Sequence, residues 1–295
     1  LNPVKVGTGS SIANASAATD KIAKAVRYAI SAGAQIINLS LGWRFEQDSL
    51  LMREIIELAN SKNILVVAGA GNDGHEAPVY PCSYENVICV ASHTVNGELS
   101  SFSNYGAHVD VVAPGEQILG AWPTGKRSRF FTADDNYEYL SGTSQAAPYV
   151  TAVLARLLNL GLTPEEAKIK LFKGARNTQR KSVRHGNVDF KSSLNQTTNS
   201  FISIQNKSPA LINWSKDTKS FLLKLQNLGT DKVNVKVTIS HEGQEGIFLP
   251  KSTYSFQAGP KEEFETRVNI VSTGAQRADY IFKLKIESDH EVKEY

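Results

Sequence analysis

The chain has 295 residues, of which 41% are hydrophobic and 21% charged, and its formal net charge at pH 7 is +3. This length exceeds that of an ordinary single core, so we expect one large and one small domain. The 32 basic residues are balanced by 29 acidic ones, which argues against a nucleic-acid partner. No apolar run approaches the roughly 20 residues of a membrane-spanning helix, so we expect no membrane span.

The beginning of the chain is apolar. Residues 1–6 (LNPVKV) are predicted to form a buried strand. Because the first residue is Leu1 rather than methionine, we expect a truncated or processed chain, and any targeting segment would lie upstream.

Up to about residue 194, helical segments alternate with short apolar runs. Apolar side chains recur at helical spacing in residues 20–32, which are followed by Gly33 as a stop signal, and in residues 50–61. The apolar runs predict strands at residues 34–42, 64–68, 87–92 and 109–115. This alternation is typical of an α/β domain with a mostly parallel sheet flanked by helices. In such sheets ligands bind at the carboxyl ends of the strands.

After about Asn195 the apolar period changes to two. Apolar and polar residues alternate in three runs, residues 233–239, 264–270 and 280–286. Turn signals at residues 227–229 and 258–260 separate these runs. The pattern predicts a small antiparallel β-sandwich. We therefore expect two domains, residues 1–195 and 196–295, with the boundary in the polar run from Asn195 to Ser200.

Ser144 lies in the sequence LSGTSQAAP, between a glycine-containing turn and an apolar helix. Backbone N–H groups and the positive end of a helix dipole favour a developing negative charge at such a position, which suits a nucleophile. Serine and threonine also open many helices as ordinary caps, so the motif alone leaves both interpretations open. It is not the Gly-x-Ser-x-Gly elbow of the α/β-hydrolases, because Ala146 occupies the last position.

A second polar feature follows the strand at residues 64–68, which leads into Gly69-Ala70-Gly71-Asn72. Three small residues allow another backbone to approach closely, and the Asn72 side chain carries an N–H donor. These properties predict an oxyanion hole, whereas a tight Asn/Gly turn is the alternative.

The chain has two cysteines, Cys82 and Cys89. They are close enough in sequence for a short disulfide-closed loop, but a pair of small buried thiols is equally compatible with the spacing. A disulfide would indicate an oxidising compartment.

Several motifs occur together and in one order: NLSLG, VVAGAGNDG, YPCSYENVICVAS, SFSNYG, VDVVAPG and LSGTSQAAP. With them, most of residues 1–194 resembles the subtilisin family of serine peptidases. The resemblance implies a serine endopeptidase that forms an acyl-enzyme at Ser144, with Asn72 and the Ser144 backbone N–H holding the oxyanion.

The resemblance also implies where a peptide substrate binds. The substrate would add as a strand along Ser40, Leu41 and Gly42, and the primary specificity pocket would be lined by Gly69, Ala70, Gly71 and Val79. Because family members often carry glycine at the position of Val79, we expect a shallower pocket that prefers small or medium apolar side chains.

The resemblance implies no cofactor for the chemistry, but it does imply a weak structural site for Ca²⁺ or another cation. Its ligands would be the carbonyls of Cys82, Tyr84 and Val87 and the carboxylate of Asp110. Local pairing or capping by Asp110 is the alternative.

Family members have a catalytic aspartate and then a histidine before the serine, and this chain lacks both motifs. None of its six histidines stands in the family's His-Gly-Thr setting. The resemblance therefore implies an upstream segment or companion chain, an N-terminal fragment that carries both residues. The other expected partners are a polypeptide substrate and a propeptide or inhibitor, and the expected location is secreted or extracytoplasmic.

Two other functions compete with an active peptidase. The chain could be a catalytically inactive, protease-like binding or regulatory protein, or the sandwich could be a partner-binding module. The intact Ser144 and Asn72 favour the enzyme, because a purely structural descendant has no physical need of either residue.

Overall fold

The chain divides into two compact units, Leu1–Asn195 and Gln196–Tyr295. The computed structural model describes residues 3–6, 19–44, 48–122, 132–134, 137–176, 183–199, 201–205, 218–241, 247–272, 282–289 and 292–294. No helix within these ranges is both long and apolar enough to cross a membrane.

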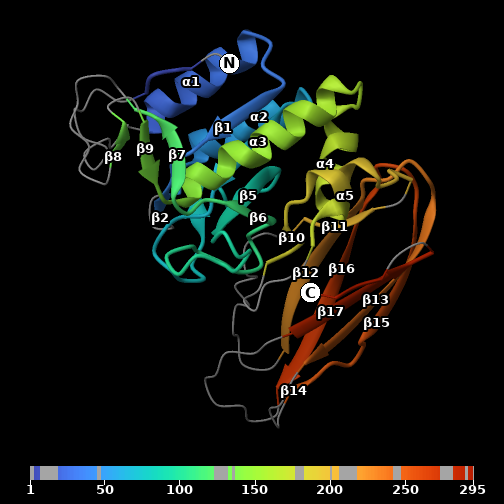
Figure 1. Ribbon diagram of the computed structural model, residues 1–295. Coiled ribbons are helices and arrows are strands. Elements are labelled where there is room, and N and C mark those ends of the chain that lie inside the picture. Colours follow the sequence, from blue (N-terminus) through green and yellow to red (C-terminus); the bar gives the residue numbers. More distant parts are fainter. Residues whose placement is uncertain are drawn as a thin grey trace. The chain divides into compact units, whose positions relative to one another are not determined.

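A five-stranded sheet forms the centre of the first unit, with all neighbouring strands parallel (Figure 1). Its order is β1-β3-β5-β6-β10. The strands are β1 (Ile36–Leu39), β3 (Leu65–Gly69), β5 (Val87–His93), β6 (Val111–Pro114) and β10 (Gly186–Asn187). Strands β3, β5 and β6 are almost wholly buried, as expected of a parallel sheet covered on both faces. The predicted α/β fold is confirmed.

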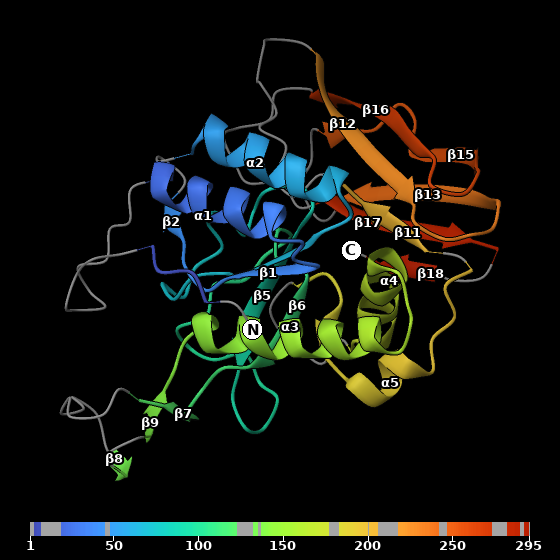
Figure 2. The same ribbon diagram turned by 90° about the horizontal axis from the view of Figure 1, so that it is seen from above.

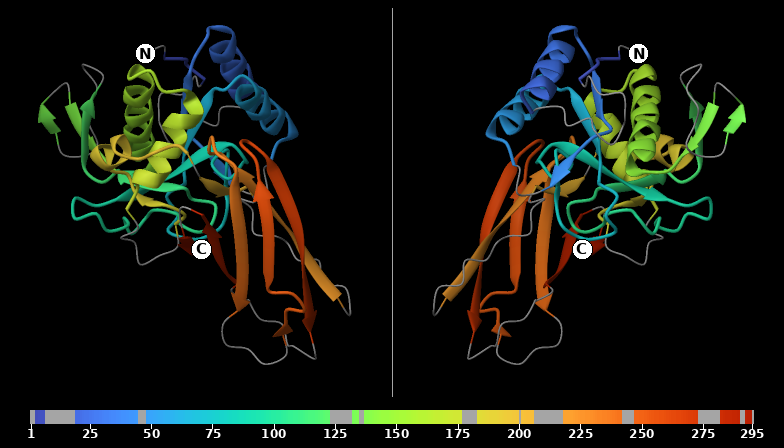
Figure 3. Two further views of the ribbon diagram at one scale, coloured as in Figure 1. Left: turned by 90° about the vertical axis from the view of Figure 1, so that its right-hand side faces the viewer. Right: turned by 90° about the vertical axis from the view of Figure 1, so that its left-hand side faces the viewer.

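Helices cover both faces of this sheet. Figures 2 and 3 show α1 (Thr19–Ser31) and α2 (Leu50–Ser61) on one face and α3 (Thr143–Asn159) on the other. The two smaller helices are α4 (Pro164–Gly174) and α5 (Phe190–Leu194). Helix α2 begins where the Ser49 side chain accepts a hydrogen bond from the Met52 N–H. Helix α1 ends before Gly33, whose φ of +76° suits glycine.

The predicted strand at the start of the chain is wrong in its described part. Residues 3–6 have no regular secondary structure, and Val4 is 40% exposed. Only Val6 packs against the core, as a partly buried side chain. Two valines separated by a lysine, after a proline that lacks a backbone donor, bury too little apolar surface to hold a strand in the sheet.

Short antiparallel ribbons lie beside the central sheet. Strand β2 (Trp43–Arg44) pairs with β4 (Val79–Tyr80), so that Trp43 is opposite Tyr80. Strands β7 (Ile118–Ala121), β9 (Tyr137–Leu140) and β8 (Thr132–Asp134) form a second ribbon in the order β7-β9-β8. The ribbon of β7 and β9 leads directly into the turn before α3.

The second unit consists of two four-stranded antiparallel sheets, which confirms the predicted β-sandwich. One has the order β11-β12-β16-β14 and the other β15-β13-β17-β18. Their bounds are β11 (Ile202–Ile204), β12 (Thr218–Asn227), β13 (Val233–His241), β14 (Ile247–Phe248), β15 (Thr253–Ala258), β16 (Glu263–Ser272), β17 (Phe282–Ser288) and β18 (Val292–Glu294). The predicted apolar positions of residues 233–239 form part of its core. Residue 280 lies outside the described residues.

A buried amide joins two turns of the sandwich. Asn227 is fully buried, and its Nδ2 donates to the carbonyls of Asp231, Ala258 and Gly259 at 2.8, 3.2 and 3.0 Å. Its Oδ1 accepts from the Gly229 N–H at 2.9 Å. The two turn signals in the sequence therefore meet at one side chain.

Candidate active site

Ser144 is the second residue of α3, immediately after the turn through Gly142. Helix α3 contacts β1, β3, β5 and β6, so its N-terminus is held against the central sheet. The first N–H groups of a helix have no acceptor within the helix. In the part of the chain that the structure describes, the Ser144 N–H has no hydrogen-bond acceptor either. It is therefore available to an acceptor from outside the chain.

The Ser144 side chain pairs with the end of β1. Its Oγ donates to the Ser40 carbonyl at 3.1 Å, while the Ser40 Oγ donates to the Ser144 carbonyl at 2.8 Å. Ser40 directly follows β1, so this reciprocal pair fixes the distance between the helix N-terminus and the carboxyl end of that strand. No hydrogen bond joins Ser144 to any of the described histidines, which are His75, His93, His108, His185 and His241.

Asn72 lies beside the same helix N-terminus. Its Oδ1 accepts a hydrogen bond from the Thr143 N–H at 2.8 Å. This bond turns the other end of the amide, Nδ2, away from Thr143. Among the described residues Nδ2 has no acceptor. Two N–H donors, one on Asn72 and one on Ser144, are thus left free on either side of Thr143.

The small residues after β3 allow this close approach. A methyl group built on Gly69 would lie only 3.1 Å from the backbone carbonyl carbon and oxygen of Thr143. The Gly71 N–H donates to Thr143 Oγ1 at 3.1 Å, and Gly71 has a φ of +102°. Glycine is required at position 69 for the close contact with Thr143 and at position 71 for the backbone conformation.

A cavity of about 320 Å³ opens at this junction. Its lining residues are Leu41, Gly42, Trp43, Gly69, Gly71, Asn72, Asp73, Val79, Thr143 and Ser144. The structure therefore brings together most of the residues that the sequence placed at the site. Ser40 contacts Ser144 without lining the cavity. Ala70 does not line it and is fully buried, because alternate side chains of an extended segment point in opposite directions.

Three lining residues were missed in the sequence. Thr143 precedes the serine, Asp73 follows Asn72, and Trp43 follows Gly42, so each adjoins a predicted residue. Asp73 is partly exposed, and its carboxylate lies 3.9 Å from His75 Nε2. Adjacency in sequence was the available signal for all three, but it cannot show which neighbours face the cavity.

Val79 forms the wall of the cavity beside Gly42 and Gly71. Its side chain lies so close to Gly42 and Gly71 that methyl groups built there would meet it at 2.9 and 3.1 Å. Its N–H donates to Ser83 Oγ at 3.2 Å, and its carbonyl accepts from the Ser83 N–H at 2.9 Å. Val79 is 5% exposed. The wall is therefore packed on both sides and has little freedom to move.

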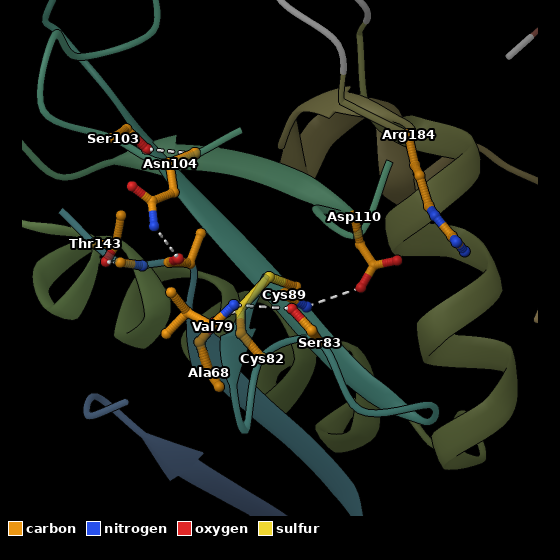
Figure 4. The surroundings of a disulfide bond; sticks show 12 residues. Ala68, Val79, Cys82, Ser83, Cys89, Ser103, Asn104, Asp110, Thr143 and Arg184 are labelled. Atoms are coloured by element: carbon orange, nitrogen blue, oxygen red, sulfur yellow. Dashed lines mark hydrogen bonds between the residues drawn. A yellow bond between two sulfur atoms is a disulfide. The ribbon is translucent and has the colours of Figure 1, made fainter. Parts of the chain in front are cut away.

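The segment behind this wall is tied to the core. Cys82 and Cys89 form a disulfide with a Cα–Cα distance of 4.7 Å (Figure 4). The rings of Tyr80 and Tyr84 stack with centroids 4.5 Å apart. Tyr84 Oη donates to Asp48 Oδ1 at 2.8 Å. Burial, reinforced by this hydrogen bond, raises the pKa of the Tyr84 phenol above its ordinary value.

Asp110, the one carboxylate of the expected cation site, has a local partner. Its Oδ2 accepts from the Cys89 N–H at 2.8 Å, and the side chain is 2% exposed. The Tyr84 carbonyl accepts from the Val87 N–H at 3.3 Å. No group of three or more His, Cys, Asp or Glu side chains placed to hold a metal occurs within the described ranges.

Residues 1–193 match the model of the subtilase family. The chain is 43% identical over 148 residues to a thermophilic serine proteinase of Bacillus sp. (strain AK1), covering 50% of this chain and 34% of that protein. It is 41% identical over 140 residues to thermitase of Thermoactinomyces vulgaris, covering 48% and 46%. The chain thus spans less than half the length of either relative.

A solved structure shares the same fold. The self-cleaved protease domain of PatA is 32% identical, with a TM-score of 0.51 over 59% of this chain and 65% of that chain.

Proposed function

Because the chain belongs to the subtilase family, we propose that it is the nucleophile-bearing part of a serine endopeptidase. Ser144 Oγ attacks the scissile carbonyl of a polypeptide while a neutral imidazole accepts its proton. Collapse of the tetrahedral intermediate breaks the peptide bond, passes that proton to the leaving amine and leaves an acyl-enzyme at Ser144. Water then hydrolyses the ester by the reverse proton transfers.

One observation carries this proposal: two residues with N–H donors that lack acceptors among the described residues, Asn72 and Ser144, line the same cavity. Asn72 Nδ2 and the Ser144 N–H have no partner in the described part of the chain. Asn72 is exposed and both residues line the cavity, so these donors are open to a bound ligand. They are useful where negative charge develops on a substrate oxygen. The positive end of the α3 dipole adds to that stabilisation.

Substrate binding follows from the two segments that border the cavity. An extended peptide adds beside Leu41 and Gly42 through main-chain hydrogen bonds, which are independent of its sequence. The side chain before the cleaved bond enters the cavity between Gly69 and Gly71, and Val79 closes the far wall. We propose a preference for small or medium apolar side chains on this basis.

The catalytic histidine and aspartate are proposed to come from an upstream segment or a companion chain. Within the described ranges β1 pairs with β3 alone, so its other edge leaves backbone N–H and C=O groups unpaired. A parallel strand added there would end near Ser40, whose carbonyl accepts from Ser144 Oγ. The solved structure of PatA is that of a self-cleaved protease domain, so self-cleavage occurs in a protein of this fold.

An inactive, protease-like binding protein is the second candidate. The observation in its favour is that Ser144 Oγ donates to the Ser40 carbonyl rather than to a base. The free Asn72 and Ser144 donors favour the enzyme, because they line the same cavity as the serine hydroxyl and suit the negative charge of an acyl-transfer intermediate.

Two measurements on the protein purified from its natural source separate these functions. Mass spectrometry should find a tightly held fragment carrying the histidine and aspartate, or the same segment in one longer chain. A fluorophosphonate probe should then label the protein, and a Ser144→Ala variant produced with that segment should not be labelled. Equal labelling of both proteins, or none of the natural protein, refutes the endopeptidase.

Four further expectations belong to this proposal, concerning location, cofactor, a structural cation and a propeptide or inhibitor. The Cys82–Cys89 disulfide supports a secreted or extracytoplasmic location, because such bonds persist in oxidising compartments. The chemistry as proposed needs no cofactor. We also propose a structural cation beside Asp110. Added Ca²⁺ should therefore raise the Tm of the protein in a saturable way. An unchanged Tm refutes the cation site. A propeptide or inhibitor would occupy the same cavity as the substrate.

A further inference from the structure

We infer that Asn104 is a positioning residue for the oxyanion hole, which it orders by holding the loop that carries Asn72. The inference rests on the proposed function of Asn72. Asn104 does not line the cavity, so it does not touch substrate and acts only through the loop.

Asn104 bonds to the loop on both sides of Asn72. Its Nδ2 donates to the Ala70 carbonyl at 3.0 Å, and its backbone N–H donates to the Gly71 carbonyl at 3.0 Å. Its Oδ1 accepts from the N–H groups of Asp73 at 2.9 Å and His75 at 3.4 Å. Four hydrogen bonds thus join one buried residue to the backbone before and after Asn72.

The fit between Asn104 and the loop is tight. A methyl group built on Gly71 would lie 2.5 Å from Asn104 Nδ2. Asn104 itself is fully buried. The glycine therefore leaves just enough room for the amide, and the amide fills the space that the missing side chain leaves.

Asn104 is anchored in turn to the central sheet. The Ser92 N–H on β5 donates to Ser103 Oγ at 2.9 Å, and Ser103 Oγ donates to the Asn104 carbonyl at 3.0 Å. Figure 4 shows Ser103 and Asn104 in this arrangement. Ser92 and Ser103 are both fully buried. The loop is therefore anchored through Asn104 and Ser103 to β5, an almost wholly buried strand of the central sheet.

Thr143 holds the opposite side of the loop. Its Oγ1 accepts from the Gly71 N–H at 3.1 Å, and its N–H donates to Asn72 Oδ1 at 2.8 Å. Thr143 therefore orients the Asn72 amide, while Asn104 fixes the backbone from which that amide projects. Loss of the Asn104 amide leaves the Ala70 carbonyl and the Asp73 N–H without these partners, and the loop must shift to satisfy them.

A double-mutant cycle on the active protein, with its histidine- and aspartate-bearing segment, tests this role. Asn72→Ala should lower kcat by about 10²- to 10³-fold, the cost of removing the side-chain donor of the oxyanion hole in subtilisin. Asn104→Ala should lower kcat by roughly 10- to 100-fold with little change in KM, because small misplacements of catalytic groups are costly. In the Asn72→Ala background, Asn104→Ala should lower kcat by less than about 3-fold, because no donor remains to be positioned.

Asn227→Ala is the matched control. Asn227 is also fully buried, and its amide also bonds only to backbone groups, but it lies in the second unit. It should lower the Tm and leave kcat unchanged. If Asn104→Ala does not fold, Asn104→Asp replaces it, since that variant keeps the acceptor for Asp73 and His75 and loses the donor to Ala70.

The outcomes distinguish the two proposals. A wild-type protein that is inactive and unlabelled by the fluorophosphonate refutes the proposed function, and the inference with it. An active wild-type protein in which the effects of the Asn72 and Asn104 substitutions multiply, or in which Asn104→Ala leaves kcat unchanged, overturns the inference alone.

Discussion

Val79 is predicted to set the size of substrate side chain that the cavity accepts. Its side chain fills the space between Gly42 and Gly71 and is 5% exposed. Val79→Ala removes two methyl groups from this wall. At about 0.8 kcal/mol for each buried methylene, a substrate that fills the new space gains about 1.6 kcal/mol. This corresponds to roughly a 15-fold increase in kcat/KM relative to a substrate with a small side chain.

The assay compares two peptide substrates that differ only before the cleaved bond, one with alanine and one with leucine. The ratio of their kcat/KM values should shift toward leucine by about 15-fold in Val79→Ala. Val67→Ala is the control, because Val67 is fully buried in β3 and does not line the cavity. A shift of less than about 2-fold in Val79→Ala, or an equal shift in both variants, would refute the assignment of Val79 as the residue that limits the size of the substrate side chain.

Three predictions concern stability. Replacing Cys82 and Cys89 by serine should lower the free energy of unfolding by about 2.5 kcal/mol, the loop-closure value for a loop of about 8 residues; an unchanged urea midpoint would contradict it. Burial raises the pKa of Tyr84. The contribution of this shift to the free energy of unfolding is therefore complete below the unfolded pKa of about 10, and it is lost as the pH rises further. Tyr84→Phe should therefore lose less stability than the wild type between pH 9 and 11, and parallel curves from chemical denaturation would count against this. Gly69→Ala would place a methyl group 3.1 Å from the Thr143 backbone and should cost about 1–3 kcal/mol by the same measurement; a cost near zero would show that the two segments are not closely packed.

The helices and core strands could be predicted because each has its own local pattern. Residues 50–61 were predicted as a helix from their apolar spacing, and α2 has these bounds. The alternation at residues 233–239 likewise matches the inward and outward positions of β13. The two-residue strands β2 and β4 escaped prediction because two residues carry no periodicity.

The site could be predicted in part. Ser144 and Asn72 carry recognisable chemistry in recognisable motifs, and they line one cavity. Ala70 was misplaced because the sequence does not show which side of an extended segment faces the cavity. The role of Asn104 could not be read from the sequence at all, since its four bonds depend on a loop 29 to 34 residues earlier in the chain.

The central claim is that Ser144 Oγ attacks a carbonyl carbon whose oxygen accepts hydrogen bonds from Asn72 Nδ2 and the Ser144 N–H. A crystal structure of the complete protein after reaction with a fluorophosphonate tests it most directly. The phosphoryl oxygen should lie about 2.7–3.1 Å from both Asn72 Nδ2 and the Ser144 nitrogen. An adduct at Ser144 whose oxygen points away from Asn72 would contradict the account.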